Sequence, residues 1–439
     1  MKPFVLLLAA CGAGAACGAV DLVRDGVLRY RVETGGSAVR ELAAGEYYRV
    51  LNAVTGCAVD DAAQAAAPGV IRLEVREAEG NDAYSIAFGE NSIVLTGNRE
   101  RSACFAMMDF LERLGCRWFW PGDDGEFLPA ATPTLSIEPF ALSSTAALPF
   151  RKLSTHPDLK KNWFFVHNRL NPDNGADDSR YRLYWGQPTS WGGHSFNWIW
   201  PEDCTSASDY FAKYPEQHAL KDGKRVSSQH CYTNPDTIRT FVDWIVRFWD
   251  EHPGIETLSL VPKDSSVHCT CAECAKTDAS TCFFTFLNTI VAGAEARRPG
   301  HRYATIAYSF YRPVPKVKLH PSVSLSYCMY NRCYKHYLGD GDDTKNPAAI
   351  AEFDAWTEVL GHAPDVYGYH FDCWGGTVPY TLPIEGILQQ EIQWARDRGV
   401  SLWMTEYHAG WGTTGDPPDM MRNYAIRFQA YAAARLLWD

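Results

Sequence analysis

The spacing of apolar residues along the chain changes at about residue 140. Before that point, alternating apolar residues predict short strands at Leu28–Val32, Ile71–Val75 and Ser92–Thr96. Helical spacing predicts helices at Val39–Leu51 and Arg101–Leu114. A proline-rich run, Pro129–Pro139, indicates a linker. We therefore predict a small α+β domain over residues 20–140.

After Leu148 the pattern becomes strand, loop and helix, repeated. The predicted strands are Phe150–Ser154, the strand that begins at Ile255, Tyr303–Tyr308, Val323–Met329, Val366–His370 and Leu402–Glu406. The predicted helices are Asp158–Val166, Thr237–Asp250, Phe283–Arg297, Pro347–Leu360, Leu382–Arg396 and Met420–Leu437. Strands that alternate with helices of this length predict a parallel sheet. We predict a (β/α)8 TIM-like barrel over residues 148–439, with a doubly wound sheet as the alternative.

The segment Ile255–Cys274 is the most informative of these. Its apolar strand ends abruptly at Pro262, Lys263 and Asp264, directly before a cysteine-rich turn. A buried strand that carries a carboxylate into a loop is typical of the active-site edge of an α/β barrel. Asp264 is therefore the first candidate catalytic residue, although a loop-capping Asp would give the same pattern.

Polar and aromatic residues follow three other predicted strands. They are Tyr330, Asn331 and Arg332; His370, Asp372 and Trp374; and Glu406, Tyr407, His408 and Trp411. In a barrel the carboxyl ends of the strands meet on one face, so we expect these groups to converge with Asp264. Carboxyl groups paired in this way suit glycoside cleavage, in which one protonates the leaving oxygen and a second acts as base or nucleophile. His194, beside Trp191, and His230 lie in loops that reach the same face.

Composition supports a sugar ligand over a nucleic acid. Aromatic residues make up 13% of the 439 residues, including 15 Trp and 22 Tyr, and their flat faces suit stacking on sugars or bases. The formal net charge of −11 repels a polyanion. The chain also lacks the sequence signatures of α/β-hydrolases, P-loop proteins and zincins. We predict a carbohydrate partner, no nucleic acid and no cofactor.

The N-terminus has the order of a secretory signal. Met1-Lys2 precedes an apolar run and then small residues up to Ala19. We predict a signal peptide over residues 1–19, and as the alternative a lipoprotein signal that makes Cys11 a lipid anchor. No other segment approaches about 18 uninterrupted apolar residues, so we predict no membrane span. The expected location is periplasmic, cell-surface or extracellular.

The cysteine-rich turn allows more than one chemistry. His268, Cys269, Cys271 and Cys274 have a spacing suggestive of zinc ligands, but no second ligand pair stands nearby in sequence. Disulfides in an exported protein, or packed thiols, are the alternatives that we favour. We accordingly predict no metal.

The chain resembles the bacterial proteins that carry domain of unknown function 4838, part of which is glycoside hydrolase family 163. The segment Phe105–Gly122 resembles the end of the N-terminal domain that these proteins share with α-glucuronidases and β-hexosaminidases. The other matching segments are Gly193–Ser195, Tyr214–Glu216, Gly223–Arg225, Gln229–Pro235, Ser259–Cys274 and Tyr431–Asp439. The resemblance implies a (β/α)8 barrel behind an α+β domain, and retaining endo-β-N-acetylglucosaminidase activity on N-glycans.

Two features depart from the family pattern. Lys263 stands where relatives usually carry Asn before the strand-end acid, and the chain stops at Asp439 where they usually continue, which suggests a short or truncated member. The leading hypothesis is an exported glycoside hydrolase with Asp264 as the acid, or as the group that orients a substrate acetamido, Glu406 as its partner and Asp372 in reserve. Two alternatives remain. The first is an α-glucuronidase-like exo-hydrolase in which Arg332 would bind the uronate carboxylate, and the second is an inactive carbohydrate-binding protein.

The same hypothesis assigns substrate-binding residues. Aromatic rings expected to stack on sugars are Trp191, Tyr330, Trp374 and Trp411. Groups expected to contact hydroxyls or line the site are His194, Asn331, Arg332, His370 and Tyr407.

Overall fold

The computed structural model describes residues 18–120, 125–155, 164–171, 193–253, 255, 257–371, 384–407 and 424–438. The chain forms two compact units. The first joins residues 1–187 with 373–385 and 408–439, and the second joins 188–372 with 386–407. Each unit is therefore made of segments that are separate in the sequence. The C-terminal helix, for example, belongs to the same unit as the N-terminal residues.

The first unit is built on a five-stranded mixed sheet in the order β10-β5-β6-β4-β3. Its strands are β3 (Tyr30–Glu33), β4 (Gly69–Val75), β5 (Ala83–Phe88), β6 (Ser92–Gly97) and β10 (Leu142–Thr145). Strands β3, β4 and β6 run parallel, and β5 and β10 pair antiparallel at the other edge. Smaller antiparallel pairings join β1 (Val20–Arg24) with β2 (Val27–Leu28) and β9 (Leu135–Ile137), and β7 (Arg117–Trp118) with β8 (Glu126–Phe127).

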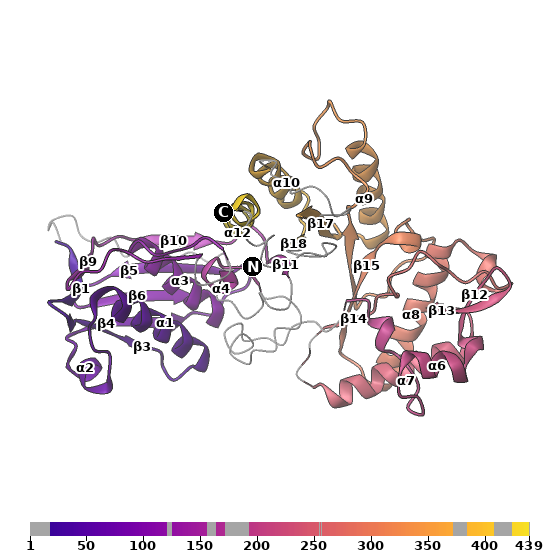
Figure 1. Cartoon of the computed structure of the whole chain (residues 1–439), viewed down its shortest axis with the longest axis horizontal. Coiled ribbons are helices and arrows are strands. Elements are labelled where there is room, and N and C mark those ends of the chain that lie inside the picture. The colour runs from indigo at the N-terminus through magenta and orange to yellow at the C-terminus, as the bar shows by residue number, and fades with distance from the viewer. Residues whose placement is uncertain are drawn as a thin grey trace. The chain divides into compact units, whose positions relative to one another are not determined.

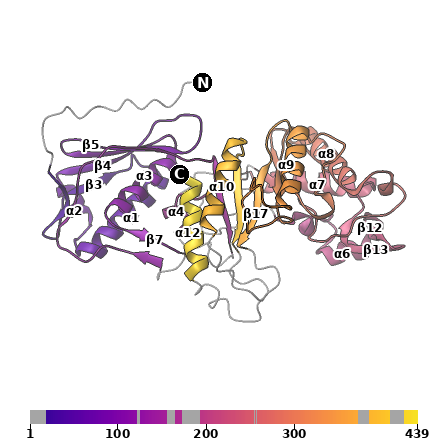
Figure 2. The ribbon, with the colours of Figure 1, turned by 90° about the horizontal axis from the view of Figure 1, so that it is seen from above.

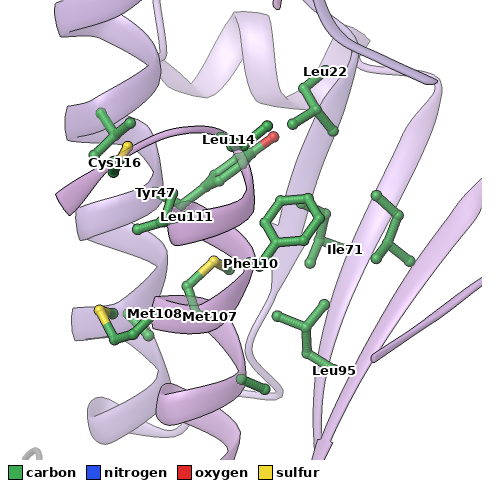
Figure 3. Close-up of a cluster of buried hydrophobic side chains, with 14 of the residues drawn as sticks. Leu22, Tyr47, Ile71, Leu95, Met107, Met108, Phe110, Leu111, Leu114 and Cys116 are labelled. Carbon is green, nitrogen blue, oxygen red and sulfur yellow. The ribbon is translucent and has the colours of Figure 1, made fainter. Parts of the chain in front are cut away.

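Helices α1 (Ala38–Thr55) and α3 (Glu100–Arg113) cover one face of this sheet (Figure 2). Ser37 caps α1 by accepting a hydrogen bond from the Arg40 amide, and Gly56 ends it with φ 67°, a conformation that favours glycine. Figure 3 shows the core between helix and sheet, where Phe110 of α3 lies near Ile71 of β4 and Leu111 lies toward Tyr47 of α1. The other elements of this unit are α2 (Asp61–Ala66), β11 (Phe150–Thr155), α4 (Phe164–His167) and α12 (Tyr424–Trp438).

The second unit contains a parallel sheet in the order β18-β17-β16-β15-β14 (Figure 1). Its strands are β14 (Thr257–Ser259), β15 (Arg302–Ala307), β16 (Val323–Cys328), β17 (Asp365–Phe371) and β18 (Leu402–Tyr407). A parallel order in which each strand pairs with the next along the chain is the arrangement of half of a β/α barrel. All five strands therefore present their carboxyl ends at one edge.

Helices precede or connect these strands. They are α6 (Ala207–Lys213), α7 (Pro235–Glu251), α8 (Ala279–Arg297), α9 (Asn346–Leu360) and α10 (Glu385–Asp397). A hairpin of β12 (His218–Lys221) and β13 (Lys224–His230) precedes α7, and 3-10 turns lie at Ser195–Trp198, Pro215–Gln217, Cys274–Lys276 and Ser309–Tyr311. Asn234 caps α7 through the amides of Asp236 and Thr237. Within the described ranges no helix combines the length and apolarity that a membrane crossing requires.

The sequence-based fold prediction is confirmed at the level of a mixed α/β chain with a curled parallel sheet. The predicted strands at 303–308, 323–329, 366–370 and 402–406 and the predicted helices between them are present, with ends shifted by a few residues. Strand β5 and the β12–β13 hairpin were not predicted. In β5 four consecutive residues, Ala83 to Ile86, are buried, so the alternation that marks a strand is missing.

Candidate functional site

Asp264 lies just beyond the carboxyl end of β14, on a segment that backbone hydrogen bonds hold in place. The Leu260 amide donates to the Ala304 carbonyl at 2.7 Å, which continues the pairing of β14 with β15. The Phe196 amide donates to the Val261 carbonyl, and the Val261 amide donates to Ser195 Oγ, both at 3.1 Å. The Asp264 side chain is 61% exposed. A firmly positioned backbone thus presents a carboxylate to solvent.

His194 is oriented toward this carboxylate. Its Nδ1 lies 2.6 Å from the Pro262 carbonyl oxygen, which can only accept, so Nδ1 carries the proton. The other ring nitrogen, Nε2, lies 3.7 Å from Asp264 Oδ1. The imidazole can therefore present either a lone pair or, when protonated, a positive charge to Asp264 or to a ligand held beside it.

A row of tyrosines extends from Asp264 across the neighbouring strand ends. The ring centroids of Tyr308 and Tyr330 lie 5.2 Å apart, and those of Tyr330 and Tyr369 lie 5.9 Å apart. Burial, with a further contribution from the Asp264 carboxylate, raises the pKa of Tyr308 above its ordinary value. The Tyr308 hydroxyl therefore stays protonated beside the Asp264 carboxylate. Tyr330 is the most open of the row, at 37% exposed.

Lys263 faces away from the exposed surface that carries Asp264. Its Nζ donates to the Ser227 carbonyl at 2.8 Å, and its own carbonyl accepts from Gln229 Nε2 at 2.6 Å. Burial lowers the pKa of Lys263 to about 8. The lysine thus anchors the segment to strand β13.

Arg332 and His370, both predicted to bind substrate, belong to a buried cluster centred on Glu391 of α10. His370 Nε2 lies 2.5 Å from Glu391 Oε2, and Arg332 is paired with the other carboxylate oxygen. These three side chains are 1–2% exposed. Burial opposes ionisation of Glu391, but the charges of His370 and Arg332 hold its pKa below the ordinary value.

Neighbouring groups fix the geometry of this cluster. His370 Nδ1 lies 3.1 Å from Thr405 Oγ1, and the Arg332 guanidinium lies 4.4 Å from the centre of the Tyr334 ring. A side chain at Gly368 would collide with the His370 ring, because a Cβ there would come within 2.7 Å of Nδ1. The cluster ties β16, β17 and β18 to α10 beneath the strand ends.

The remaining predicted residues divide into two groups. Asn331 is exposed next to Tyr330, and His230 is buried, with Nε2 3.4 Å from the Phe196 carbonyl oxygen. Glu406 and Tyr407 are the last residues of β18, so their backbones lie at the same edge of the sheet as Asp264, but their side chains lie outside the described part of the chain. Outside it altogether lie Trp191, Asp372, Trp374, His408 and Trp411, together with the N-terminal signal and Cys11.

The cysteine-rich turn gains a partner that the sequence did not suggest. The sulfur atoms of Cys231, Cys269, Cys271 and Cys274 all lie within 4.8 Å of one another. His268, predicted alongside the three nearby cysteines, instead has its ring 5.8 Å from that of Phe310. Cys231 was missed because it lies at the end of β13, far from the turn in sequence.

Tyr308 and Tyr369 were also missed, although a signal for them existed. Tyr308 directly follows β15 and is the last residue of the predicted strand Tyr303–Tyr308, so listing the last residue of every predicted strand would have found it. Tyr369 lies inside a predicted strand, where an aromatic residue is ordinarily part of the core.

Together these features define an α/β protein with a polar and aromatic site at the carboxyl edge of a parallel sheet. The family model described as a domain of unknown function, DUF4838, matches residues 120–439, and the chain belongs to that family. This confirms the resemblance seen in the sequence. No curated protein sequence matches the chain.

Solved structures with a similar fold include three from glycoside hydrolase families. One is a family 138 enzyme targeting pectin rhamnogalacturonan II, at TM-score 0.56 and 10% identity, covering 93% of this chain and 51% of that one. A family 115 4-O-methyl-α-glucuronidase with specificity for decorated arabinogalactans gives TM-score 0.55 and 13% identity, covering 95% and 57%. A Streptomyces plicatus β-hexosaminidase in complex with GlcNAc gives TM-score 0.54 and 14% identity, covering 97% and 88%. The chain spans about half the length of the first two.

Proposed function

We propose that this protein is an exported glycoside hydrolase whose proton donor is Asp264. The observation that carries the proposal is the exposed Asp264 carboxylate, with His194 Nε2 3.7 Å away and a row of tyrosine rings that begins at Tyr308 beside it. A carboxyl group next to flat aromatic faces is the chemistry that glycoside cleavage needs. The fold shared with three glycoside hydrolases supports the same conclusion.

The chemistry assigns one step to each group. Protonated Asp264 donates its proton to the glycosidic oxygen as the bond from that oxygen to the anomeric carbon breaks. A nucleophile attacks the opposite face of that carbon; it is Glu406, with Asp372 in reserve, or the oxygen of a substrate 2-acetamido group. Water then releases the product and returns a proton to Asp264. In the acetamido-assisted course Asp264 can instead orient the acetamido group, and Glu406 then donates the proton to the departing glycosidic oxygen.

His194 and Tyr308 act as positioning residues in this scheme. The protonated Tyr308 hydroxyl lies beside the carboxylate, and the His194 ring, fixed through Nδ1, limits the rotation of the carboxylate. Tyr330 offers an exposed ring for stacking on a sugar, and Asn331 offers an amide to sugar hydroxyls. The eight-stranded closure of the barrel and secretion through residues 1–19 are parts of the same proposal.

The proposed substrate is a β-linked N-acetylglucosaminide within a glycan, cleaved with retention by an endo-acting enzyme. The resemblance of the sequence to glycoside hydrolase family 163 and the fold shared with a β-hexosaminidase that holds GlcNAc support this choice. An α-glucuronidase-like reaction is the alternative, since a family 115 α-glucuronidase shares the fold. It is less well supported because Arg332, its proposed uronate clamp, is 1% exposed and paired with Glu391. The third candidate is a carbohydrate-binding protein without activity.

The test is an assay of the mature protein on a complex N-glycoprotein, chitooligosaccharides and glucuronoxylan. We expect release of N-glycan, lost in Asp264→Asn and in Glu406→Gln. Asp222→Asn, an exposed Asp in the turn between β12 and β13, is the matched control and should keep full activity. Release from glucuronoxylan would favour the α-glucuronidase alternative. Sugar binding that survives both variants without any release would establish the inactive carbohydrate-binding protein instead.

A further inference from the structure

Four cysteines from two separate segments meet beside the loop that carries Asp264. Cys231 ends the β12–β13 hairpin region, whereas Cys269, Cys271 and Cys274 follow Asp264 in the loop after β14. Cys231 Sγ lies 3.7 Å from Cys271 Sγ and 3.8 Å from Cys274 Sγ. Three of the four residues are buried, and Cys271 is partly exposed.

These separations distinguish between two kinds of sulfur chemistry. Sulfur atoms in a disulfide are bonded at about 2.05 Å. Four thiolates around a tetrahedral zinc ion, with zinc–sulfur bonds of about 2.3 Å, lie about 3.8 Å from one another. The two sulfur separations given above match the edge of such a tetrahedron. All eleven cysteines within the described residues are free thiols.

The groups around the sulfurs also suit a thiolate cluster. Backbone amides point at two of the sulfurs, the Leu220 amide at Cys269 Sγ at 3.3 Å and the Cys274 amide at Cys271 Sγ at 3.5 Å. The Arg225 guanidinium interacts electrostatically with Cys231. Four thiolates and one zinc ion carry a net charge of about −2, which amide donors and a cation stabilise.

We propose that Cys231, Cys269, Cys271 and Cys274 bind one structural zinc ion. Four protein ligands leave the metal no open position for water or substrate, so the site is structural. It goes beyond the proposed glycosidase function and does not depend on it. The sequence alone offers Cys269, Cys271 and Cys274 as candidate zinc ligands, and the fourth ligand, Cys231, comes from another loop.

Zinc at this site joins the loop after β14 to the β12–β13 hairpin. The loop already contacts the hairpin through the Thr270 amide, which donates to the Leu220 carbonyl at 2.8 Å, and through Lys263 Nζ at Ser227. Cys269 follows Asp264 closely in sequence, so a metal there restrains the segment that positions this carboxylate. The ion therefore contributes to folding of the second unit, as structural zinc sites do.

The first measurement is the metal content of the full mature chain, purified under reducing conditions without added metal. We expect about one zinc ion per chain by elemental mass spectrometry. Replacement by Co²⁺ should give the sulfur-to-cobalt charge-transfer absorption and the intense visible bands of a tetrahedral thiolate site. The cobalt spectrum of the wild-type protein needs no variant, so it tests the ligand set even if substitutions impair folding.

The variants then assign the ligands. Cys231→Ser and Cys274→Ser should lose stoichiometric zinc, whereas Cys204→Ser, a buried cysteine elsewhere in the same unit, should retain it. Cys271→His keeps a zinc-binding side chain and should retain metal with a shifted cobalt spectrum. A wild-type protein that takes up neither metal, or a disulfide between any two of the four cysteines in peptide mapping, would overturn the proposal. Loss of glycan release with zinc intact would bear only on the glycosidase proposal.

Discussion

Adjacent residues at the end of β14 have opposite environments. Lys263 is 8% exposed and bonded to strand β13, whereas the Asp264 side chain is 61% exposed. An extended chain sends successive side chains to opposite sides, so a buried residue is followed by an exposed one. The backbone itself therefore keeps the Lys263 side chain away from the acid.

Tyr330 offers a residue-scale test of sugar stacking. We expect Tyr330→Ala to raise KM for the glycan about two- to ten-fold, because an aromatic contact contributes about 0.5–1.5 kcal/mol, with little change in kcat. Tyr330→Phe keeps the ring and should stay near wild type. The measurement is steady-state kinetics on the released glycan. An unchanged KM for the alanine variant would place the sugar elsewhere.

Asp365 gives a pH dependence whose sign is fixed by its environment. Burial of its carboxyl group raises its pKa to about 6, although its Oδ1 accepts a hydrogen bond from the Leu402 amide at 2.9 Å. The folded state therefore holds this proton more tightly than the unfolded state. The protonated Asp365 carboxyl group therefore makes its full contribution to the free energy of unfolding below about pH 4. This contribution is lost as the pH rises to about 6, and it stays lost at higher pH.

Asp365→Asn should remove this loss, because the amide oxygen can still accept from Leu402 but carries no charge. We expect the variant to be more stable than wild type by about 3 kcal/mol at pH 7, with the difference shrinking toward pH 4. Urea unfolding followed across that range measures it. Asp342→Asn, at an exposed position, is the control and should match wild type at every pH. If the free energies of unfolding of Asp365→Asn and wild type differed by the same amount at every pH from 4 to 7, the Asp365 carboxyl group would not titrate in that range.

At the scale of elements, the Glu391 cluster connects helix α10 to three strands. Arg332 follows β16, His370 lies near the end of β17, and Thr405 lies in β18. Its charged groups are sealed beneath the strand ends, so they act on a substrate only through the geometry of those ends. Arg332 and His370 thus support the site rather than line its surface.

Removing one charged partner from this cluster should destabilise the folded protein. We expect Glu391→Gln to destabilise the protein by about 3–5 kcal/mol, because the Arg332 charge would remain buried without a counter-charge. Denaturant unfolding measures the loss. Glu358→Gln on α9, an exposed site, should change stability by less than about 0.5 kcal/mol. An equal effect of the two substitutions would mean that the cluster contributes no net ion-pair energy.

Elements with a strong local period could be predicted from the sequence, whereas contacts between distant segments could not. Helix α7 repeats apolar residues on one face, and β15 and β16 alternate, so their positions followed from the pattern alone. The partnership of Glu391 with Arg332, and of Cys231 with the cysteine-rich turn, depends on which loops meet in space. Asp264 was predictable because its position relative to a strand end is itself a local feature.

At the scale of the whole molecule, the last helix completes the first unit. Trp438 of α12 has its ring 5.3 Å from each of the rings of Tyr84 and Phe105, and its Nε1 donates to Ser144 Oγ at 2.8 Å. Its carbonyl accepts from the Ala147 amide at 2.7 Å. The N-terminal sheet therefore depends on residues from the far end of the chain.

This dependence predicts that Trp438→Ala destabilises the first unit selectively. We expect a loss of about 3–5 kcal/mol, because a large and fully buried side chain would leave a cavity. Hydrogen exchange read by mass spectrometry should show faster exchange in peptides of β4, β6 and α3 and unchanged exchange in β15 and β16. Phe428→Ala on the same helix, at a position 57% exposed, should leave both sets unchanged. Equal loss of protection in β15 and β16 would show instead that the two units unfold as one, and that the C-terminal helix stabilises the whole chain rather than its first unit.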